Sequence, residues 1–435
     1  MKKTLKNTLC LLALLIGMLE LFAACGTGAG AANEFTANGV RYRINSDGSS
    51  VTVVSSANHL SLSGALTIPE KVTHRGKTYP VTSIKHFAFE DCHRLTSVII
   101  PNTVTEIGSC AFRYCRSLTM VTIPPSVTAI GSEAFRECSQ LIKVIIPNSV
   151  TNIGTCAFSN CEHLTLIHVE PGNPVYDSRE QCNAVINTAL NTLVIGCSRT
   201  SIPSSVTEIG RHAFDHCPGL TEVVIPDSVT NIDNYAFYAC PDLTSVTLPN
   251  SVTRIGEAAF FDCQNLESIN FPNSLRKIGM SAFYDCTSLT SVTIPNSVKD
   301  LDQCAFQNCR ALTSTVIGDS VDEIGKFAFY DCRKLTSVTI GHSVTRISKG
   351  AFQNCESLTN IKIPNSVTSI SLLAFAGCTS LTSITIPESV GSISQYAFAD
   401  CTSLTTVILP DSIAYLDGLA FHNTPYEKLK TEDGK

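Results

Sequence analysis

The chain contains no tryptophan, and only 16% of its 435 residues are charged, below the roughly one quarter that is usual for soluble proteins. The lack of tryptophan argues against a sugar-binding surface, because an aromatic platform would have to be built from tyrosine or phenylalanine. The net charge is −6, and no cluster of lysine and arginine follows the N-terminal segment. The electrostatic footprint of a nucleic-acid-binding protein is therefore missing.

Motifs for catalysis and for metal binding are also scarce. The chain has no Cys-x-x-Cys pair and no glycine-rich phosphate loop, and its ten histidines are scattered. A hydrolase would need a nucleophile, a base and an orienting acid in one cleft. Arg211, His212, Asp215 and His216 fall in or beside one short turn, and we expect them to be solvated. We therefore expect no enzymatic activity, no cofactor and no metal site.

What the sequence does contain is a repeat. An Ala-Phe pair occurs fourteen times at intervals of 23 residues, apart from one interval of 56 residues between Phe158 and Phe214. A fixed period of this length indicates stacked structural units rather than one globular core. A single unit of this size cannot bury its apolar residues, so each unit depends on its neighbours.

One unit shows the pattern of elements. Residues 289–294 read Leu-Thr-Ser-Val-Thr-Ile, which matches the strand of a leucine-rich repeat, and Pro295 ends this strand. A second short extended piece follows, and then a compact turn with Ala305, Phe306 and Cys309. We predict a β-rich leucine-rich-repeat solenoid with a parallel β-sheet on its concave face. Short strands and helical or 3-10 turns are expected on the convex side.

The departures from the repeat divide the chain into segments. Residues 1–25 are predicted to be a signal peptide and 26–33 a flexible tether. Residues 34–67 carry the pattern of an N-terminal capping hairpin. About 14 repeats fill residues 68–423, with an insertion at 170–200, and residues 424–435 form a C-terminal cap and tail. Within the insertion, the apolar runs Ala184–Ile186 and Leu193–Ile195 predict a hairpin.

The N-terminal segment has the features of an export signal. Three lysines precede the apolar run Leu9–Ile16, and Leu21–Ala24 leads directly into Cys25. Small residues immediately before a cysteine resemble a bacterial lipobox, and this resemblance implies that Cys25 becomes lipid-modified. Cleavage after Ala31 is the alternative, and it would release a soluble protein without Cys25.

The twenty cysteines follow the repeat rather than a disulfide framework. In a stack, side chains at one repeat position point in parallel directions, which is wrong for a disulfide bond. We therefore expect buried free thiols at the column of thirteen: Cys92, Cys115, Cys138, Cys161, Cys217, Cys240, Cys263, Cys286, Cys309, Cys332, Cys355, Cys378 and Cys401. Cys182 and Cys197 in the insertion are the candidate disulfide. Three aspartates that precede column cysteines, Asp262, Asp285 and Asp331, are expected on a solvated edge, and weak calcium binding along the convex edge is the alternative.

The unit I-P-x-S-V-T-x-I-G-x-x-A-F-x-x-C-x-x-L-T-S-V-T resembles the BspA-like leucine-rich repeat, a type also described from treponemal proteins. The resemblance covers about residues 34–424. It implies an exported bacterial protein, either a cell-surface or outer-membrane lipoprotein or a secreted one, and often an adhesin. The implied partner is a protein of the host matrix or of another cell surface. We expect a monomer that meets the membrane only through its lipid anchor.

The outward positions of the strands are the expected binding surface. They are mostly threonine and serine, so a specific partner would engage the departures from this background. We propose these departures, together with a tyrosine of the insertion, as candidate binding residues: Ile99, Met120, Ile142, Lys143, Ile145, Leu166, His168 and Tyr176. The alternatives are neutral drift at these positions and a structural coat or spacer protein without a specific ligand.

Overall fold

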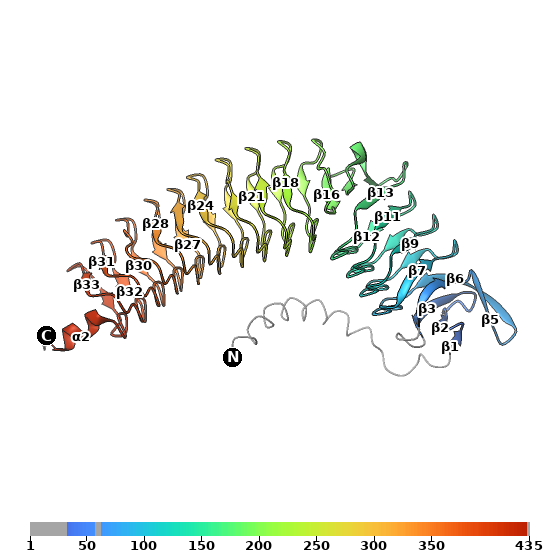
Figure 1. The fold of residues 1–435 in the computed structure, drawn as a ribbon, viewed down its shortest axis with the longest axis horizontal. Coiled ribbons are helices and arrows are strands. Elements are labelled where there is room, and N and C mark those ends of the chain that lie inside the picture. Colours follow the sequence, from blue (N-terminus) through green and yellow to red (C-terminus); the bar gives the residue numbers. More distant parts are fainter. Residues whose placement is uncertain (1–32, 57–61, 433–435) are drawn as a thin grey trace.

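The computed structural model describes residues 33–56 and 62–432, and it is a curved array of stacked coils (Figure 1). Most regular coils supply one strand to each of two series and return through the Ala-Phe turn; the coil that begins at Leu358 has no strand in the first series. Cys25, the signal peptide and most of the tether lie outside the described residues. The solenoid of stacked parallel strands is confirmed, whereas the assignment of one sheet to the concave face stays a prediction.

The first strand series comes from the Leu-x-x-Val-x-Ile segments and forms four parallel sheets. Alternation of side chains along each strand places Val and Ile inside and Ser or Thr outside. The strands are β4 (Gly64–Thr67), β7 (Leu95–Ile99), β9 (Met120–Thr122), β11 (Lys143–Ile146), β13 (Leu166–Val169), β18 (Glu222–Val224), β20 (Ser245–Thr247), β22 (Ser268–Ile269), β24 (Ser291–Ile294), β26 (Ser314–Ile317), β28 (Ser337–Thr339), β31 (Ser383–Thr385) and β33 (Thr406–Ile408).

The second series comes from the Val-Thr-x-Ile segments and is mostly strands of two residues. Within each half of the array, the apolar residue of each strand pairs with its counterpart in the next coil, as Ile130 does with Ile153, so the register is fixed by the repeat. The strands are β6 (Lys77–Ile84), β8 (Glu106–Ile107), β10 (Ala129–Ile130), β12 (Asn152–Ile153), β17 (Glu208–Ile209), β19 (Asn231–Ile232), β21 (Arg254–Ile255), β23 (Lys277–Ile278), β25 (Asp300–Leu301), β27 (Glu323–Ile324), β29 (Arg346–Ile347), β30 (Ser369–Ile370), β32 (Ser392–Ile393) and β34 (Tyr415–Leu416).

Both ends of the array carry non-repeating elements. At the N-terminal end, β1 (Glu34–Ala37), β2 (Val40–Ile44) and β3 (Val51–Ser56) pair in antiparallel fashion, and β3 then pairs in parallel with β6. A further strand, β5 (Lys71–His74), forms an antiparallel hairpin with β6. At the C-terminal end, helix α2 (Pro425–Glu432) follows the last turn. Thr424 occupies the position of the column cysteine, and its Oγ1 accepts a hydrogen bond from the backbone N–H of Glu427 at 3.1 Å.

The insertion interrupts both strand series. It contains β14 (Tyr176–Asp177), the 3-10 helix η2 (Arg179–Gln181), β15 (Val185–Asn187) and β16 (Thr192–Ile195). β15 and β16 pair in antiparallel fashion, which confirms the predicted hairpin. β16 then pairs in parallel with β17, so the strands of the insertion, beginning with β14, start the sheet of the C-terminal half. The buried apolar residues accordingly form two clusters, which meet at the insertion.

The Ala-Phe turn is not helical, so the expectation of helical or 3-10 turns is not confirmed. In the turn around Phe283, Ser281 and Asp285 both have left-handed backbones, with φ of 55° and 58°. The N–H of Phe283 donates to the carbonyl of Ala305 in the next coil at 2.8 Å, whereas Tyr284 donates back to Ser281 at 3.1 Å. The turns therefore form a third hydrogen-bonded ladder. Among residues 34–56 and 62–432, helix is confined to η2 and α2.

The phenylalanines of the turns form stacks in the core. Neighbouring rings are nearly parallel, with centroids 4.9–5.4 Å apart, from Phe89 to Phe158 and again from Phe214 to Phe421. Beside each stack lie the column cysteines, which are buried free thiols as predicted. Most of them donate a hydrogen bond to a phenylalanine carbonyl of the previous coil, as Cys309 does to Phe283 at 3.2 Å.

Candidate functional site

Seven of the eight candidate binding residues lie on, or directly before, four neighbouring strands of one sheet, β7, β9, β11 and β13. We call their outward-facing side the strand surface. Strand register places Met120, Lys143 and Leu166 in one column across the sheet. A second column contains Ile99, Thr122, Ile145 and His168. Backbone bonds from Ile142 to Thr119 and from Thr165 to Ile142 place Ile142 in a third column.

The exposed fractions of these side chains show that the strand surface lies on the outside of the coils. Ile99, Met120 and Ile142 expose 53%, 58% and 53% of their area, and Lys143 is also exposed. Ile145, Leu166 and His168 are half-buried. Adjacent strands lie about 4.8 Å apart, so these side chains are direct neighbours. The structure therefore brings together seven of the eight candidates as one apolar surface with a lysine and a histidine.

Tyr176 does not belong to the strand surface. Its exposed fraction is 8%, and it lies in β14, opposite Asn187 of β15. The side-chain amide oxygen of Asn173 accepts the backbone N–H groups of Val175 and Tyr176, each at 2.9 Å, and this turn directs the strand that follows. The tyrosine therefore packs into the core at the insertion, and it is withdrawn as a binding residue.

Cys182 and Cys197 are both buried, and the structure describes them as free thiols. The Sγ of Cys182 approaches the carbonyl of Ala184 at 3.9 Å, and the Sγ of Cys197 approaches the carbonyl of Asn183 at 3.5 Å. Burial raises the pKa of both thiols, which makes them poor nucleophiles for disulfide exchange. The disulfide between them stays a prediction.

Several exposed apolar residues were missed by the sequence analysis. Val224 exposes 71% of its area and Val316 42%, and both are outward residues of the first strand series in the C-terminal half. In β26, Thr315 and Val316 reverse the usual order, so the threonine faces inward and the valine outward. The sequence did carry a signal for these residues: each is apolar at a strand position where other repeats have Ser or Thr. Unlike the residues of the strand surface, these valines have no exposed apolar neighbour at the same position in the adjacent coil.

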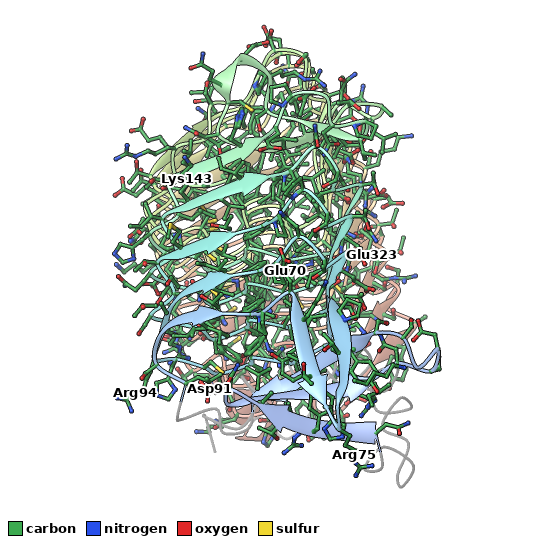
Figure 2. The ribbon with its side chains drawn as sticks, turned by 90° about the vertical axis from the view of Figure 1, so that its right-hand side faces the viewer. Glu70, Arg75, Asp91, Arg94, Lys143 and Glu323 are labelled. Atoms are coloured by element: carbon green, nitrogen blue, oxygen red, sulfur yellow. The ribbon has the colours of Figure 1, made fainter. Side chains whose placement is uncertain are left out.

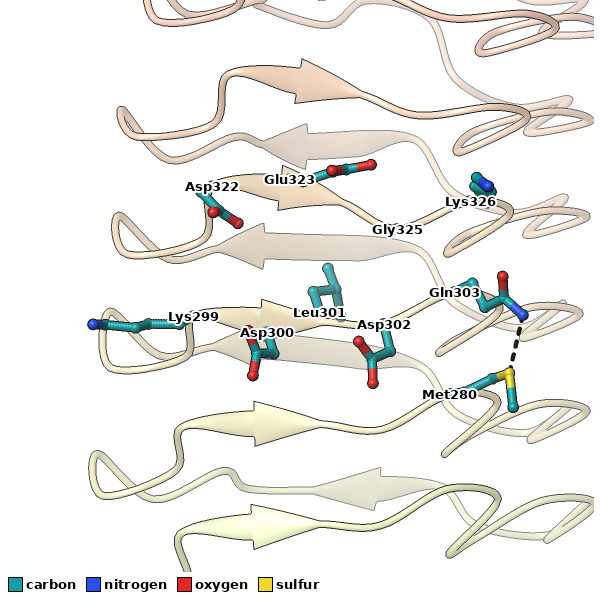
Figure 3. Close-up of a pocket in the computed structure, with 10 residues that line it drawn as sticks. All are labelled: Met280, Lys299, Asp300, Leu301, Asp302, Gln303, Asp322, Glu323, Gly325 and Lys326. Carbon is teal, nitrogen blue, oxygen red and sulfur yellow. Dashed lines mark hydrogen bonds between the residues drawn. The ribbon is translucent and has the colours of Figure 1, made fainter.

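The second strand series carries an acidic groove of about 470 Å³ (Figure 3). Asp300, Asp302, Asp322 and Glu323 line it from β25, β27 and the residues beside them. Lysines offset this charge, because the Nζ of Lys277 lies 2.9 Å from Asp302 and 3.9 Å from Asp300. Figure 2 shows Lys143 of the strand surface and Glu323 of the groove toward opposite sides of the array. The groove and the strand surface are therefore separate.

The turn around Phe214 differs from expectation. Asp215 is buried, with 7% of its area exposed, and His212 and His216 are only partly exposed. The Nδ1 of His216 lies 2.8 Å from Oδ1 of Asp215, and the Nδ1 of His212 lies 3.6 Å from Oδ2. Burial raises the pKa of Asp215, but its contacts with the two imidazoles outweigh burial and hold the pKa well below its usual range. The prediction of solvated turn positions holds for Arg211, which is exposed, and was wrong for Asp215.

The expectation of a solvated edge for the aspartates before the column cysteines was wrong for two of them. Asp285 and Asp331 are buried, with 8% and 4% of their area exposed.

The family of the chain follows from its repeat. The model of the BspA type leucine-rich repeat region matches residues 77–179, 185–313 and 305–430. The chain belongs to the BspA-type leucine-rich repeat family. This match confirms the family that was predicted from the repeat unit with its Ala-Phe turn and column cysteine.

Solved structures of bacterial leucine-rich repeat proteins are similar to this chain. A leucine-rich repeat protein from Bacteroides ovatus is 28% identical, with a TM-score of 0.55, and the match covers 89% of this chain and 92% of that one. A leucine rich cell surface protein from Faecalibacterium prausnitzii is 30% identical, with a TM-score of 0.55 and coverage of 91% and 97%. A leucine-rich repeat protein from Eubacterium ventriosum is 24% identical, with a TM-score of 0.52 and coverage of 78% and 93%.

No curated protein was found to match the chain. Within residues 33–56 and 62–432, no helix of this BspA-type protein has the length and apolar character needed to cross a bilayer.

Proposed function

We propose that this BspA-type repeat protein is an exported bacterial surface protein that binds a protein partner through its strand surface. The observation that carries the proposal is the continuity of Ile99, Met120, Ile142 and Lys143 across consecutive coils, on a background of serine and threonine. Exposed apolar residues that adjoin one another are typical of interaction sites. The similar protein from Faecalibacterium prausnitzii is described as a cell surface protein, which supports export.

A protein is the partner class that this surface fits. The centre of the strand surface is apolar, and Lys143 and His168 add polar groups within the same columns. Protein interfaces combine an apolar centre with polar groups around it, whereas nucleic-acid interfaces need a basic field that this chain lacks. We propose a partner from the host matrix or from the surface of another cell. The proposed activity is binding without catalysis.

The test compares two variants that carry the same charges on equivalent positions. Ile142→Asp with Ile145→Asp places two carboxylates in the strand surface. Thr290→Asp with Thr293→Asp places them on β24 and the residue before it, in the other half of the array. Partners are captured from host matrix and from neighbouring bacteria with each protein. We expect the first variant to lose a partner that the second retains, and equal capture by both would exclude the strand surface.

The rival function is a structural coat or spacer, which the predominance of serine and threonine at the outward strand positions of the C-terminal half favours. A coat protein would capture no partner that depends on the strand surface. The same two variants therefore separate the two functions.

We further propose that Cys25 carries the lipid anchor. Metabolic labelling with palmitate would label the wild-type protein but not a Cys25→Ala variant. Cleavage after Ala31 instead predicts no label in either protein, together with release of the protein from the cells.

A further inference from the structure

The junction between the two halves of the array holds a cluster of metal-binding side chains. Cys156 comes from the Phe158 turn, and His212 and Asp215 come from the Phe214 turn, on the other side of the insertion. One ligand atom of each residue lies within 4.8 Å of the other two. Cys156 and His212 occupy equivalent positions, two residues before the phenylalanine, so the stacking of turns brings them together.

The distances within the cluster suit a tetrahedral ion. Zinc binds sulfur at about 2.3 Å and nitrogen or oxygen at about 2.0–2.2 Å, so neighbouring ligand atoms of a tetrahedral site lie roughly 3.3–3.7 Å apart. The Sγ of Cys156 lies 3.4 Å from Oδ2 of Asp215. The Nδ1 of His212 lies 3.6 Å from the same oxygen. Both distances match edges of such a tetrahedron.

The histidine nitrogen also points to a missing ligand. Nδ1 of His212 is buried, and apart from its 3.6 Å ion-pair contact with Asp215 it has no hydrogen-bond partner within the described part of the chain. A buried polar atom of this kind is costly unless something satisfies it. The imidazole stacks on the ring of Tyr235, with centroids 4.8 Å apart and an interplanar angle of 5°. This stacking holds Nδ1 in position toward Asp215.

A second layer of contacts supports the carboxylate. The hydroxyl of Ser159 donates to Oδ2 of Asp215 at 2.9 Å and to its backbone carbonyl at 3.2 Å. His216 contacts the other carboxylate oxygen at 2.8 Å. Outer contacts of this type orient ligands in known metal sites. Arg136 and Glu133 lie near the cluster and form an ion pair with each other. Their charges offset one another, so the cluster keeps the negative charge that attracts a cation.

We propose that Cys156, His212 and Asp215 bind a zinc-like transition-metal ion that clasps the two halves of the array. The combination of thiolate, imidazole and carboxylate selects zinc over magnesium or calcium, which prefer oxygen ligands only. On binding, the Cys156 thiol releases its proton to solvent and its sulfur bonds to the metal. The ion joins two turns at the place where the phenylalanine stack stops, and this site is independent of the strand surface.

Cobalt and zinc titration of the reduced full chain tests the proposal. We expect one Co²⁺ per chain, with the charge-transfer absorption of a cobalt–thiolate bond, and displacement of Co²⁺ by Zn²⁺. Cys156→Ser and His212→Gln lose this absorption. Cys110→Ser retains it, because Cys110 has the same turn position two coils earlier but lies beside Arg113 and Glu133 instead of a histidine.

Thermal unfolding supplies a readout that does not depend on absorption. Zinc raises the melting temperature of the wild type and of Cys110→Ser, but not that of His212→Gln. Ser159→Ala weakens zinc binding by roughly 10- to 100-fold, as loss of an outer contact does. Absence of the cobalt–thiolate band in the wild type, or its persistence in Cys156→Ser, overturns the proposal.

Discussion

The thiol of Cys309 donates a hydrogen bond to the backbone carbonyl of Phe283, one coil earlier, with an S···O distance of 3.2 Å. The same bond recurs at ten further column cysteines, with S···O distances of 3.0–3.3 Å. It uses the proton of the thiol, so it exists only while the sulfur is protonated. The column therefore links adjacent coils in a way that depends on pH.

The first prediction concerns stability at high pH. Burial raises the pKa of the Cys309 thiol well above its ordinary value. Above the unfolded pKa of about 8.5, the unfolded chain loses this proton while the folded chain keeps it. The stability is therefore unaffected below that pH and falls as pH rises, by about 1.4 kcal/mol per pH unit for each such thiol. Denaturant unfolding between neutral and alkaline pH measures the slope.

Two variants separate this titration from a simple loss of packing. Cys309→Ala lowers stability at neutral pH, but its alkaline slope is shallower by about 1.4 kcal/mol per pH unit, so the difference from the wild type shrinks as pH rises. Thr424 stands at the equivalent turn position, and its hydroxyl donates to the carbonyl of Phe421 at 2.7 Å. Because a threonine hydroxyl does not titrate in this range, Thr424→Ala should leave the slope unchanged. Equal slopes in all three proteins would contradict a pH-dependent thiol column.

Most of the fold could be predicted from the sequence because the repeat is strict. The spacing of Phe283 from Phe306 fixed the coil length, and the Leu-x-x-Val-x-Ile pattern identified the first strand series. The conformation of the Ala-Phe turn could not be predicted, because the turn is too short for its left-handed residues to give a hydrophobic pattern that identifies it. Their trace in the sequence is the preference for Asp, Asn or Gly two residues after Phe, at Asp91, Asn160, Asp262, Asp285, Asn308, Asp331, Asn354, Gly377, Asp400 and Asn423.

The candidate sites were harder to predict for a different reason. The strand surface follows the repeat, so alternation along the strands correctly placed Ile99, Met120 and Ile142 outside. The junction cluster depends instead on how the insertion lets the Phe158 and Phe214 turns approach. Cys156 and His212 are 56 residues apart in sequence, and only the fold shows that they are neighbours. Tyr176 was misplaced because the hairpin of the insertion has its own alternation.

The second prediction concerns the reversed pair in β26. The hydroxyl of Thr315 is buried, with 2% of the residue exposed, and has no hydrogen-bond partner among the described residues. Thr315→Val replaces it with a methyl group of similar shape, and we expect a gain of about 1–2 kcal/mol in unfolding free energy. Val292 is its partner in the preceding coil, and Val292→Thr should cost a similar amount. A destabilising Thr315→Val would show that the hydroxyl has a partner after all.

The third prediction concerns the phenylalanine stack. Phe283 is fully buried and stacks on Phe260 and Phe306 at centroid distances of 5.2 Å on each side. Phe283→Ala should cost about 3–5 kcal/mol, because it leaves a cavity and removes both stacked-ring contacts together with an edge contact to Phe271. Phe421 ends the stack, with Phe398 on one side and an edge contact from Tyr426. Phe421→Ala should cost less, and chemical denaturation of the two variants compares them. Equal losses would mean that stacking within the column adds little.

The fourth prediction concerns the junction itself. There Gly196 makes the hydrogen bond to the next turn that a phenylalanine makes in a regular coil. Its N–H donates to the carbonyl of Ala213 at 2.7 Å, as the N–H of Phe135 does to Ala157 at 2.8 Å in a regular coil. A Cβ at Gly196 would lie 2.2 Å from a ring carbon of Phe214, so the ring has to move. Gly196→Ala should cost about 1–3 kcal/mol or more, because overpacking forces side chains out of their preferred positions.

Gly391 is the matched control for this substitution. The nearest atom to a Cβ there is the carbonyl oxygen of Thr368 at 3.9 Å, and its backbone is not left-handed. Gly391→Ala should be neutral or stabilise the protein by about 0.4–1 kcal/mol, because alanine restricts the unfolded chain. Urea unfolding of both variants gives the comparison. If Gly196→Ala is tolerated as well as Gly391→Ala, the close contact between the insertion and the Phe214 ring does not define how the two halves join.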